Sequence, residues 1–115
     1  MADLTKAQLA ARVLEHLGVK SAQNAAAASD DAFVQEAIDA AHDWLRPFGL
    51  VPFATSAIPT WAQTPLRDYV AIDVAQAFGI SGQRLLEYKS AARDGERELQ
   101  RQVAGYRPPI SLHPD

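Results

Sequence analysis

The sequence has 115 residues, of which 48% are hydrophobic and 22% are charged, with a formal net charge of −3 and no cysteine. This length suits one domain built around a single hydrophobic core. The lack of cysteine excludes disulfides, thiol nucleophiles and cysteine-based zinc sites. The acidic balance argues against a protein that binds nucleic acid through a basic surface.

The first predicted helix covers about residues 5–17. Thr5 and Gln8 form a capping box, and Leu4 and Leu9 have the spacing of a hydrophobic staple. Gly18 is suited to the left-handed conformation that ends a helix. The first residues contain no apolar leader, and the longest apolar stretch, residues 49–61, is interrupted by prolines. We therefore expect a soluble protein with no membrane contact.

A second helix follows a linker at residues 19–29, which we expect to be partly helical. Ser29, Asp30 and Asp31 are candidate caps and place negative charge at the helix start. Pro47 is expected to end the helix. Apolar residues at helical spacing predict its buried face. They are Phe33, Ala37, Ile38, Ala41, Trp44 and Leu45.

Residues 48–59 are too rich in proline to form a helix and too apolar to lie entirely in solvent. We expect a packed loop with a short extended piece at about residues 50–53. Such a loop can cover the core or present an apolar edge to a partner. Leu50, Val51 and Phe53 are its candidate contact residues.

The third predicted helix has Thr64 as its cap, Pro65 at its first position and Gly79 at its end. Its apolar residues again recur at helical spacing, which predicts a buried face. They are Leu66, Tyr69, Val70, Val74, Ala77 and Phe78.

The fourth helix is expected to begin after Ser81 and to run for about twenty residues, or about 30 Å. Gly95 occupies one position of its apolar pattern, where a glycine is useful if another backbone must approach closely. The other members of the pattern are Leu85, Tyr88, Ala92, Leu99 and Val103. The predicted fold is therefore all-α, a small four-helix bundle with a long C-terminal helix.

The fourth helix also carries a basic stripe, because cations recur at every fourth position. These cations are Lys89, Arg93, Arg97 and Arg101. The stripe could dock on an acidic protein surface or on DNA phosphates, and it is a candidate subunit or partner interface. Alternatively, Asp94 and Glu98 could pair with these cations, which would make the stripe an ordinary exposed face.

Residues 104–115 form a second region, an extended proline-rich arm that follows the helical domain of residues 1–103. Prolines prevent the arm from continuing the helix, yet it carries apolar anchors. A frayed terminus is the alternative interpretation. The candidate docking residues of the arm are Tyr106, Arg107, Pro108, Pro109, Ile110 and Leu112.

No catalytic pattern emerges from the sequence. Asp39 and His42 have a spacing seen in metal sites of helical bundles, but the second copy that such sites need is missing. There is no glycine-rich phosphate loop. We expect no enzyme activity and no cofactor, although a pair of acids acting in cell-wall hydrolysis stays open.

The order of four elements resembles a known family. A short capped helix ends in Leu17-Gly18-Val19, and a second helix ends in the aromatic Trp44 before an apolar loop. A third helix opens with Pro65-Leu66-Arg67-Asp68-Tyr69-Val70, and a long fourth helix precedes a proline-rich tail. This order resembles the head-to-tail adaptor proteins of tailed bacteriophages, described as tail accessory, head-completion or packaged-DNA-stabilisation proteins.

The resemblance implies a structural connector of the virion, made in the bacterial host cytoplasm and located at the head–tail junction. It implies a ring of copies, matched to the twelvefold portal protein ring, that extends the DNA channel and helps to retain packaged DNA. The ring would receive a tail hub or tail-completion protein, and DNA would pass through without sequence-specific binding. The arm would contact the portal. This arm is much shorter than in adaptors of short-tailed phages, so the tail type stays open.

A second hypothesis is a small helix-turn-helix DNA-binding regulator. The junction Gly79-Ile80-Ser81-Gly82 between the third and fourth helices is tight enough for that motif. Arg84 is the only cation at the start of the fourth helix, which counts against DNA binding there.

Overall fold

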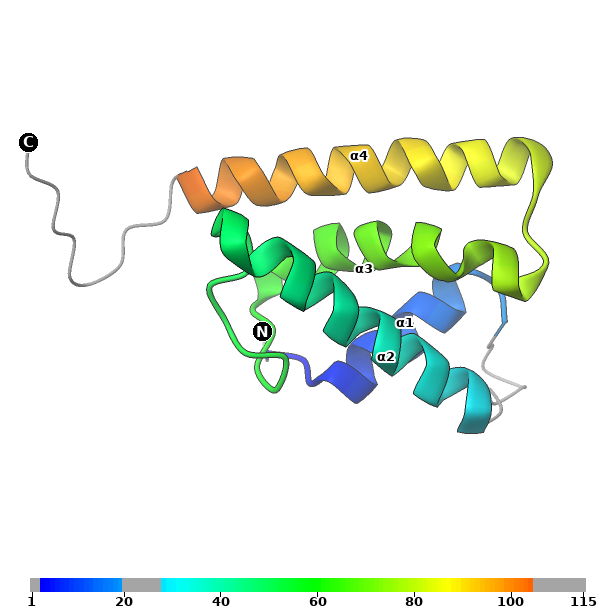
Figure 1. Cartoon of the computed structure of the whole chain (residues 1–115), viewed down its shortest axis with the longest axis horizontal. Helices are drawn as coiled ribbons and strands as arrows, with labels where there is room; N and C mark the ends of the chain where they lie inside the picture. Colours follow the sequence, from blue (N-terminus) through cyan, green and yellow to red (C-terminus); the bar gives the residue numbers. More distant parts are fainter. Residues whose placement is uncertain (1–2, 20–27, 105–115) are drawn as a thin grey trace, which may run out of the picture.

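The computed structural model describes residues 3–19 and 28–104, and these residues form an all-α fold, as predicted. Its helices are α1 (Lys6–His16), α2 (Ala28–Leu45), α3 (Thr60–Ala75) and α4 (Gly82–Ala104), with 3-10 turns η1 (Arg46–Phe48) and η2 (Gln76–Phe78). Helices α3 and α4 run side by side as an antiparallel hairpin, and α1 and α2 pack on α3 (Figure 1). The long helix α4 therefore forms an outer layer.

The start of α1 has the predicted capping box. The Thr5 amide donates to Gln8 Oε1 at 2.9 Å, and the Gln8 amide donates to Thr5 Oγ1 at 3.2 Å. Leu4 and Leu9 are both buried. Leu4 also exchanges two backbone hydrogen bonds with Ile58, at 3.0 and 2.7 Å, so the chain start is bound to the segment before α3.

Helix α2 begins one residue earlier than the predicted caps. Ser29 therefore lies inside the helix, and its prediction as a cap is wrong. Asp30 and Asp31 lie in the first turn, where negative charge interacts favourably with the positive end of the helix dipole. Residues 20–27 of the predicted linker lie outside the described residues.

The predicted buried face of α2 is wrong in part. Phe33 is 41% exposed and Trp44 is 65% exposed. The residues that α2 buries are Val34, Ile38, Ala41 and Leu45. These have the same 3.6-residue period as Phe33, Ala37 and Trp44 but are displaced by one residue, about 100° around the helix. Periodicity alone could not decide which stripe faces the core.

The loop after α2 covers the core, which was one of its two predicted roles. Helix α2 ends at Leu45, and Pro47 lies in the 3-10 turn that follows. Leu50, Val51 and Ile58 are then buried, at 7%, 3% and 0% exposure.

Helix α3 starts at Thr60, so the predictions that Thr64 caps it and that Pro65 opens it are wrong. The additional first turn buries Ala62 completely, and this burial stabilises the extension of the helix towards Pro59. Pro65 lies in the second turn, where its missing amide removes only the hydrogen bond to the carbonyl of Trp61. The predicted burial of Leu66, Val70 and Val74 is confirmed, Tyr69 and Phe78 are half-buried, and Ala77 is exposed.

Helix α4 begins directly after Ser81, as predicted, and buries Ala92, Gly95 and Leu99. A side chain built on Gly95 would place its β carbon 2.6 Å from the Pro65 carbonyl oxygen. The prediction of a close backbone approach at this glycine is therefore confirmed.

Candidate functional site

The most accessible candidate surface is the outer face of α4, opposite the face that packs on α3 (Figure 1). All four members of the predicted basic stripe are exposed: Lys89, Arg93, Arg97 and Arg101. The structure therefore places them together along one solvent-facing side.

The two halves of this stripe differ in their ion pairs. Arg97 lies 3.9 Å from Asp94, and Arg101 pairs with Glu98. The pKa of Glu98 is lowered, first by the hydrogen bond from Gln102 and then by Arg101. The C-terminal half of the stripe thus matches the interpretation of a face laced with salt bridges.

Lys89 and Arg93 make no ion pair with any of the described residues. The N-terminal half of the stripe therefore presents two cations whose charges are not neutralised within residues 3–19 and 28–104. Cations without an ion pair are better suited to bind an acidic partner than Arg97 and Arg101, which are already paired.

A second surface was missed by the sequence prediction because Phe33 and Trp44 were expected to be buried. In the described part of the chain, Phe33, Trp44, Phe48 and Leu86 are the large hydrophobic residues that are exposed. Three of them lie on α2 and η1, and the Trp44 and Phe48 ring centroids are 6.2 Å apart. An exposed aromatic cluster of this kind is typical of a protein–protein contact.

A hollow of about 310 Å³ adjoins this aromatic cluster between α2 and α3. Ala40, Ala41 and Trp44 line one side, and Tyr69 and Asp73 line the other. Burial raises the pKa of Asp73. The pKa of Tyr69 is also raised, by burial first and then by nearby carboxylates. Both shifts favour the protonated, neutral forms of Tyr69 and Asp73.

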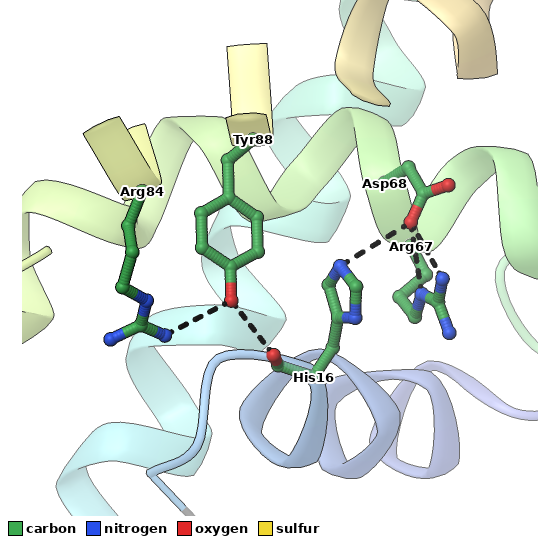
Figure 2. Close-up of polar contacts among 5 residues, drawn as sticks. All are labelled: His16, Arg67, Asp68, Arg84 and Tyr88. Atoms are coloured by element: carbon green, nitrogen blue, oxygen red, sulfur yellow. Dashed lines mark hydrogen bonds and ion pairs between the residues drawn. The ribbon is translucent and has the colours of Figure 1, made fainter. Parts of the chain in front are cut away.

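Five polar residues from α1, α3 and α4 form a separate cluster (Figure 2). Tyr88 Oη donates to the His16 carbonyl oxygen at 2.9 Å, and Arg84 Nη2 donates to Tyr88 Oη at 3.3 Å. Across from them, Arg67 donates two hydrogen bonds to Asp68 Oδ1, at 3.0 and 2.8 Å. The hydrogen bonds of Arg84 and Tyr88 bind the start of α4 to the end of α1, whose last carbonyls lack partners within the helix.

The imidazole of His16 is the chemically notable member of this cluster. Its Nε2 atom lies 3.6 Å from Asp68 Oδ1 and has no hydrogen-bond partner among the described residues. Burial, followed by the charge of Arg67, lowers the His16 pKa, while Asp68 opposes that shift. The nearby Tyr88 hydroxyl donates to backbone instead of to the imidazole. The cluster therefore has the geometry of a structural contact between helices. None of its hydroxyl groups is hydrogen-bonded to the imidazole, as a nucleophile activated by a histidine base would be.

A groove of about 380 Å³ between α3 and α4 brings the carboxylates of Asp68, Asp94 and Glu98 near Trp61. Each of these acids is paired with an arginine. A glycosidase acid requires a raised pKa, whereas the pKa of Glu98 is lowered. The groove therefore does not favour the hypothesis of cell-wall hydrolysis.

The candidate metal pair is used in tertiary contacts. Asp39 Oδ2 accepts a hydrogen bond from Lys6 Nζ at 2.9 Å, and His42 Nε2 lies 2.6 Å from the carbonyl oxygen of Phe53, to which it donates. Within residues 3–19 and 28–104, no group of three or more His, Asp or Glu side chains is arranged to hold a metal ion.

The geometry also does not match a helix-turn-helix motif. Helices of that motif cross at about 90–120°, whereas α3 and α4 lie antiparallel along one another (Figure 1). Arg84, the cation at the start of α4, donates a hydrogen bond to Tyr88 (Figure 2). It also donates to the carbonyl oxygen of Leu17 at the end of α1.

The other predicted contact residues have different positions. Leu50 and Val51 are buried in the core, so they offer no contact surface and their prediction as loop contacts is wrong. Phe53 is half-buried, with its ring centroid 5.7 Å from that of Trp61. The arm residues lie outside the described residues. They are Tyr106, Arg107, Pro108, Pro109, Ile110 and Leu112.

Comparison with protein-family models, with curated proteins and with solved structures finds no match for this chain. None of the helices in the described part is both long and apolar enough to span a membrane. The fold and surfaces define a small all-α protein with two exposed helix faces of different chemistry.

Proposed function

We propose that this chain is a structural head-to-tail connector of a tailed bacteriophage. In this proposal, copies form a ring on the portal, extend the DNA channel, help to retain packaged DNA and receive the tail. The chain acts by binding and carries out no catalysis. The sequence resemblance to portal adaptors supports this assignment.

The structural observation that carries the proposal is the position of α4. This helix has 23 residues, and only one side of it is buried, against α3. Its other side presents Lys89 and Arg93 without ion pairs among the described residues. A helix of this length with an exposed, partly unneutralised face is suited to contact a neighbour in an assembly. In the sequence, residues 105–115 of the predicted arm follow directly after Ala104, the last residue of α4.

The proposal is tested by mixing the purified protein with the portal ring and measuring the mass of the complex. We expect several copies bound per portal ring. A full-length variant with Tyr106→Ala, Ile110→Ala and Leu112→Ala should bind more weakly, because the arm would lose its apolar anchors. Its far-UV circular dichroism should match that of the wild type. Absence of any portal binding by the wild type would contradict the proposal.

A further inference from the structure

Helix α2 carries two apolar stripes, and within residues 3–19 and 28–104 only one of them is fully buried. The second stripe, which we call the α2 outer stripe, consists of Phe33, Ala37, Ala40, Trp44 and, beyond the helix end, Phe48. Trp44 and Phe48 are each 65% exposed. An exposed stripe with three aromatic side chains on so small a domain calls for a partner that covers it.

The charge beside this stripe is negative. Helix α2 contains no lysine or arginine between Ala28 and Leu45. Glu36 is exposed and has no ion pair among the described residues, and Asp43 pairs only with Arg46, at 3.7 Å with both side chains about 70% exposed. The partner should therefore carry cations beside an apolar group.

Helix α4 presents that chemistry on the same chain. Leu86, the remaining exposed large hydrophobic residue of the described part, is 57% exposed. Lys89 and Arg93 follow it at i+3 and i+7, which places all three on one helix face. We call these three residues the α4 patch. Within one chain, Lys89 and Arg93 form no ion pair with Glu36 or Asp43.

We propose that the α2 outer stripe of one copy binds the α4 patch of a second copy. Leu86 then covers Trp44 and Phe48, while Lys89 and Arg93 face the acids of α2. The inference rests on the proposed function, in which copies of the chain are neighbours, and it names the surfaces through which they meet.

The two surfaces lie on different helices, so this contact is heterologous. Each bound pair keeps one free α2 outer stripe and one free α4 patch. Further copies can therefore add in the same way, and the series closes into a ring or continues as a filament. A two-fold dimer is not the product of this contact.

The chain has no cysteine, so introduced cysteines report this contact without background. Ala40→Cys lies in the α2 outer stripe, and Ser90→Cys lies beside the α4 patch. Both positions are exposed, and neither change removes an aromatic ring or a charge. The two single variants are mixed at high concentration and treated with a short bifunctional maleimide, and the products are separated on a denaturing gel.

We expect cross-linked dimers in the mixture and little product from either variant alone. A chain with both cysteines should give a ladder of higher oligomers. The matched control pairs Arg12→Cys, an exposed position on α1, with Ser90→Cys and should give little product. The inference is overturned if Ala40→Cys or Ser90→Cys cross-links with itself as readily as in the mixture. It is also overturned if the control pair reacts as fast, or if the mixture gives no dimer.

Charge reversal provides a second test, which distinguishes a specific contact from cross-linking by random collision. In the cross-linking chain, Glu36→Lys with Asp43→Lys should lower the cross-linking rate roughly tenfold, and so should Lys89→Glu with Arg93→Glu, because like charges then face one another. Combining both pairs in one chain should restore the rate. Portal binding by the same variants separates the two proposals. Portal binding without specific cross-linking overturns only this inference, and cross-linking without portal binding contradicts only the connector function.

Discussion

Gly95 of α4 packs directly on the backbone of Pro65 in α3. A β carbon at position 95 would lie 2.6 Å from the Pro65 carbonyl oxygen, a distance that real side chains do not tolerate. Because the obstructing atom belongs to the backbone, it cannot rotate away as a side chain would. This contact sets how closely α4 lies on α3, and therefore which side of α4 remains exposed.

Replacing Gly95 by alanine should destabilise the protein. Alanine gains about 1 kcal/mol of helix propensity, but forcing a methyl group into a packed interface costs about 1–3 kcal/mol. Because the obstructing atom belongs to the backbone, we expect a cost in the upper part of that range, about 2–3 kcal/mol. After the gain in helix propensity, the net loss in the free energy of unfolding should be about 1–2 kcal/mol, measured by urea denaturation. Ser90→Ala, on the exposed face of the same helix, is the control and should change stability little. A Gly95→Ala protein as stable as the wild type would show that the two helices can separate freely.

Tyr88→Phe should weaken the attachment of α4 to α1. The change removes the hydroxyl that donates to the His16 carbonyl oxygen at 2.9 Å and preserves the ring. A hydrogen bond of this kind contributes about 0.5–1.5 kcal/mol, and thermal denaturation should show a corresponding loss. Tyr69→Phe is the matched control, since the Tyr69 hydroxyl has no hydrogen bond among the described residues. Equal losses in both variants would contradict the assigned role of Tyr88.

Stability should fall as the pH drops below 6.5, because of His16. Its folded-state pKa is lowered from 6.5 by burial and by Arg67, against the opposing effect of Asp68. The unfolded chain therefore binds more protons just below pH 6.5 than the folded chain does, and protonation favours unfolding. The effect is absent above pH 6.5 and grows as the pH falls towards the folded-state value.

The pH dependence is measured as the free energy of unfolding across this range for the wild type and for His16→Gln. The variant should lose the decline that starts near pH 6.5. Asp73 has the opposite effect on stability, and at more acidic pH. Its folded-state pKa is raised from 3.8, so the folded chain binds more protons than the unfolded chain and protonation of Asp73 favours folding. A profile for His16→Gln that follows the wild type would show that another group causes the decline.

Substitutions in the two halves of the α4 basic stripe should weaken binding to a neighbour to different extents. Lys89→Gln with Arg93→Gln removes cations that have no ion pair among the described residues, whereas Arg97→Gln with Arg101→Gln removes cations already paired with Asp94 and Glu98. We expect the first pair of changes to weaken binding to a neighbour more, in an affinity measurement at low salt. Exposed ion pairs contribute little to folding, so both variants should unfold like the wild type. Equal effects on binding would contradict this division of the stripe.

The sequence predicted those parts of the fold that depend on local chemistry. The capping box of Thr5 and Gln8 needs only residues within one turn, and it forms as expected. Gly18 and Gly79 both adopt positive φ where a helix ends, because few other residues accept that conformation. The glycine at position 95 was also recognised as a point of close approach, although its partner on α3 was not.

Features that depend on tertiary packing were predicted less well. Thr64 and Pro65 have the local pattern of a helix start, but burial of Ala62 extends α3 by a further turn. In α2 the apolar stripe through Phe33 and Trp44 competes with the one through Val34 and Leu45, and only the position of the other helices selects between them. The exposed aromatic surface could not be predicted for the same reason.

The connector function is best tested by measuring the mass of the protein alone and together with the portal ring. We expect a mostly monomeric protein in isolation at low concentration and a complex in which several copies occupy one portal ring. The count of bound copies should be matched to the portal symmetry. A portal ring whose mass is unchanged by an excess of this protein would contradict the connector function.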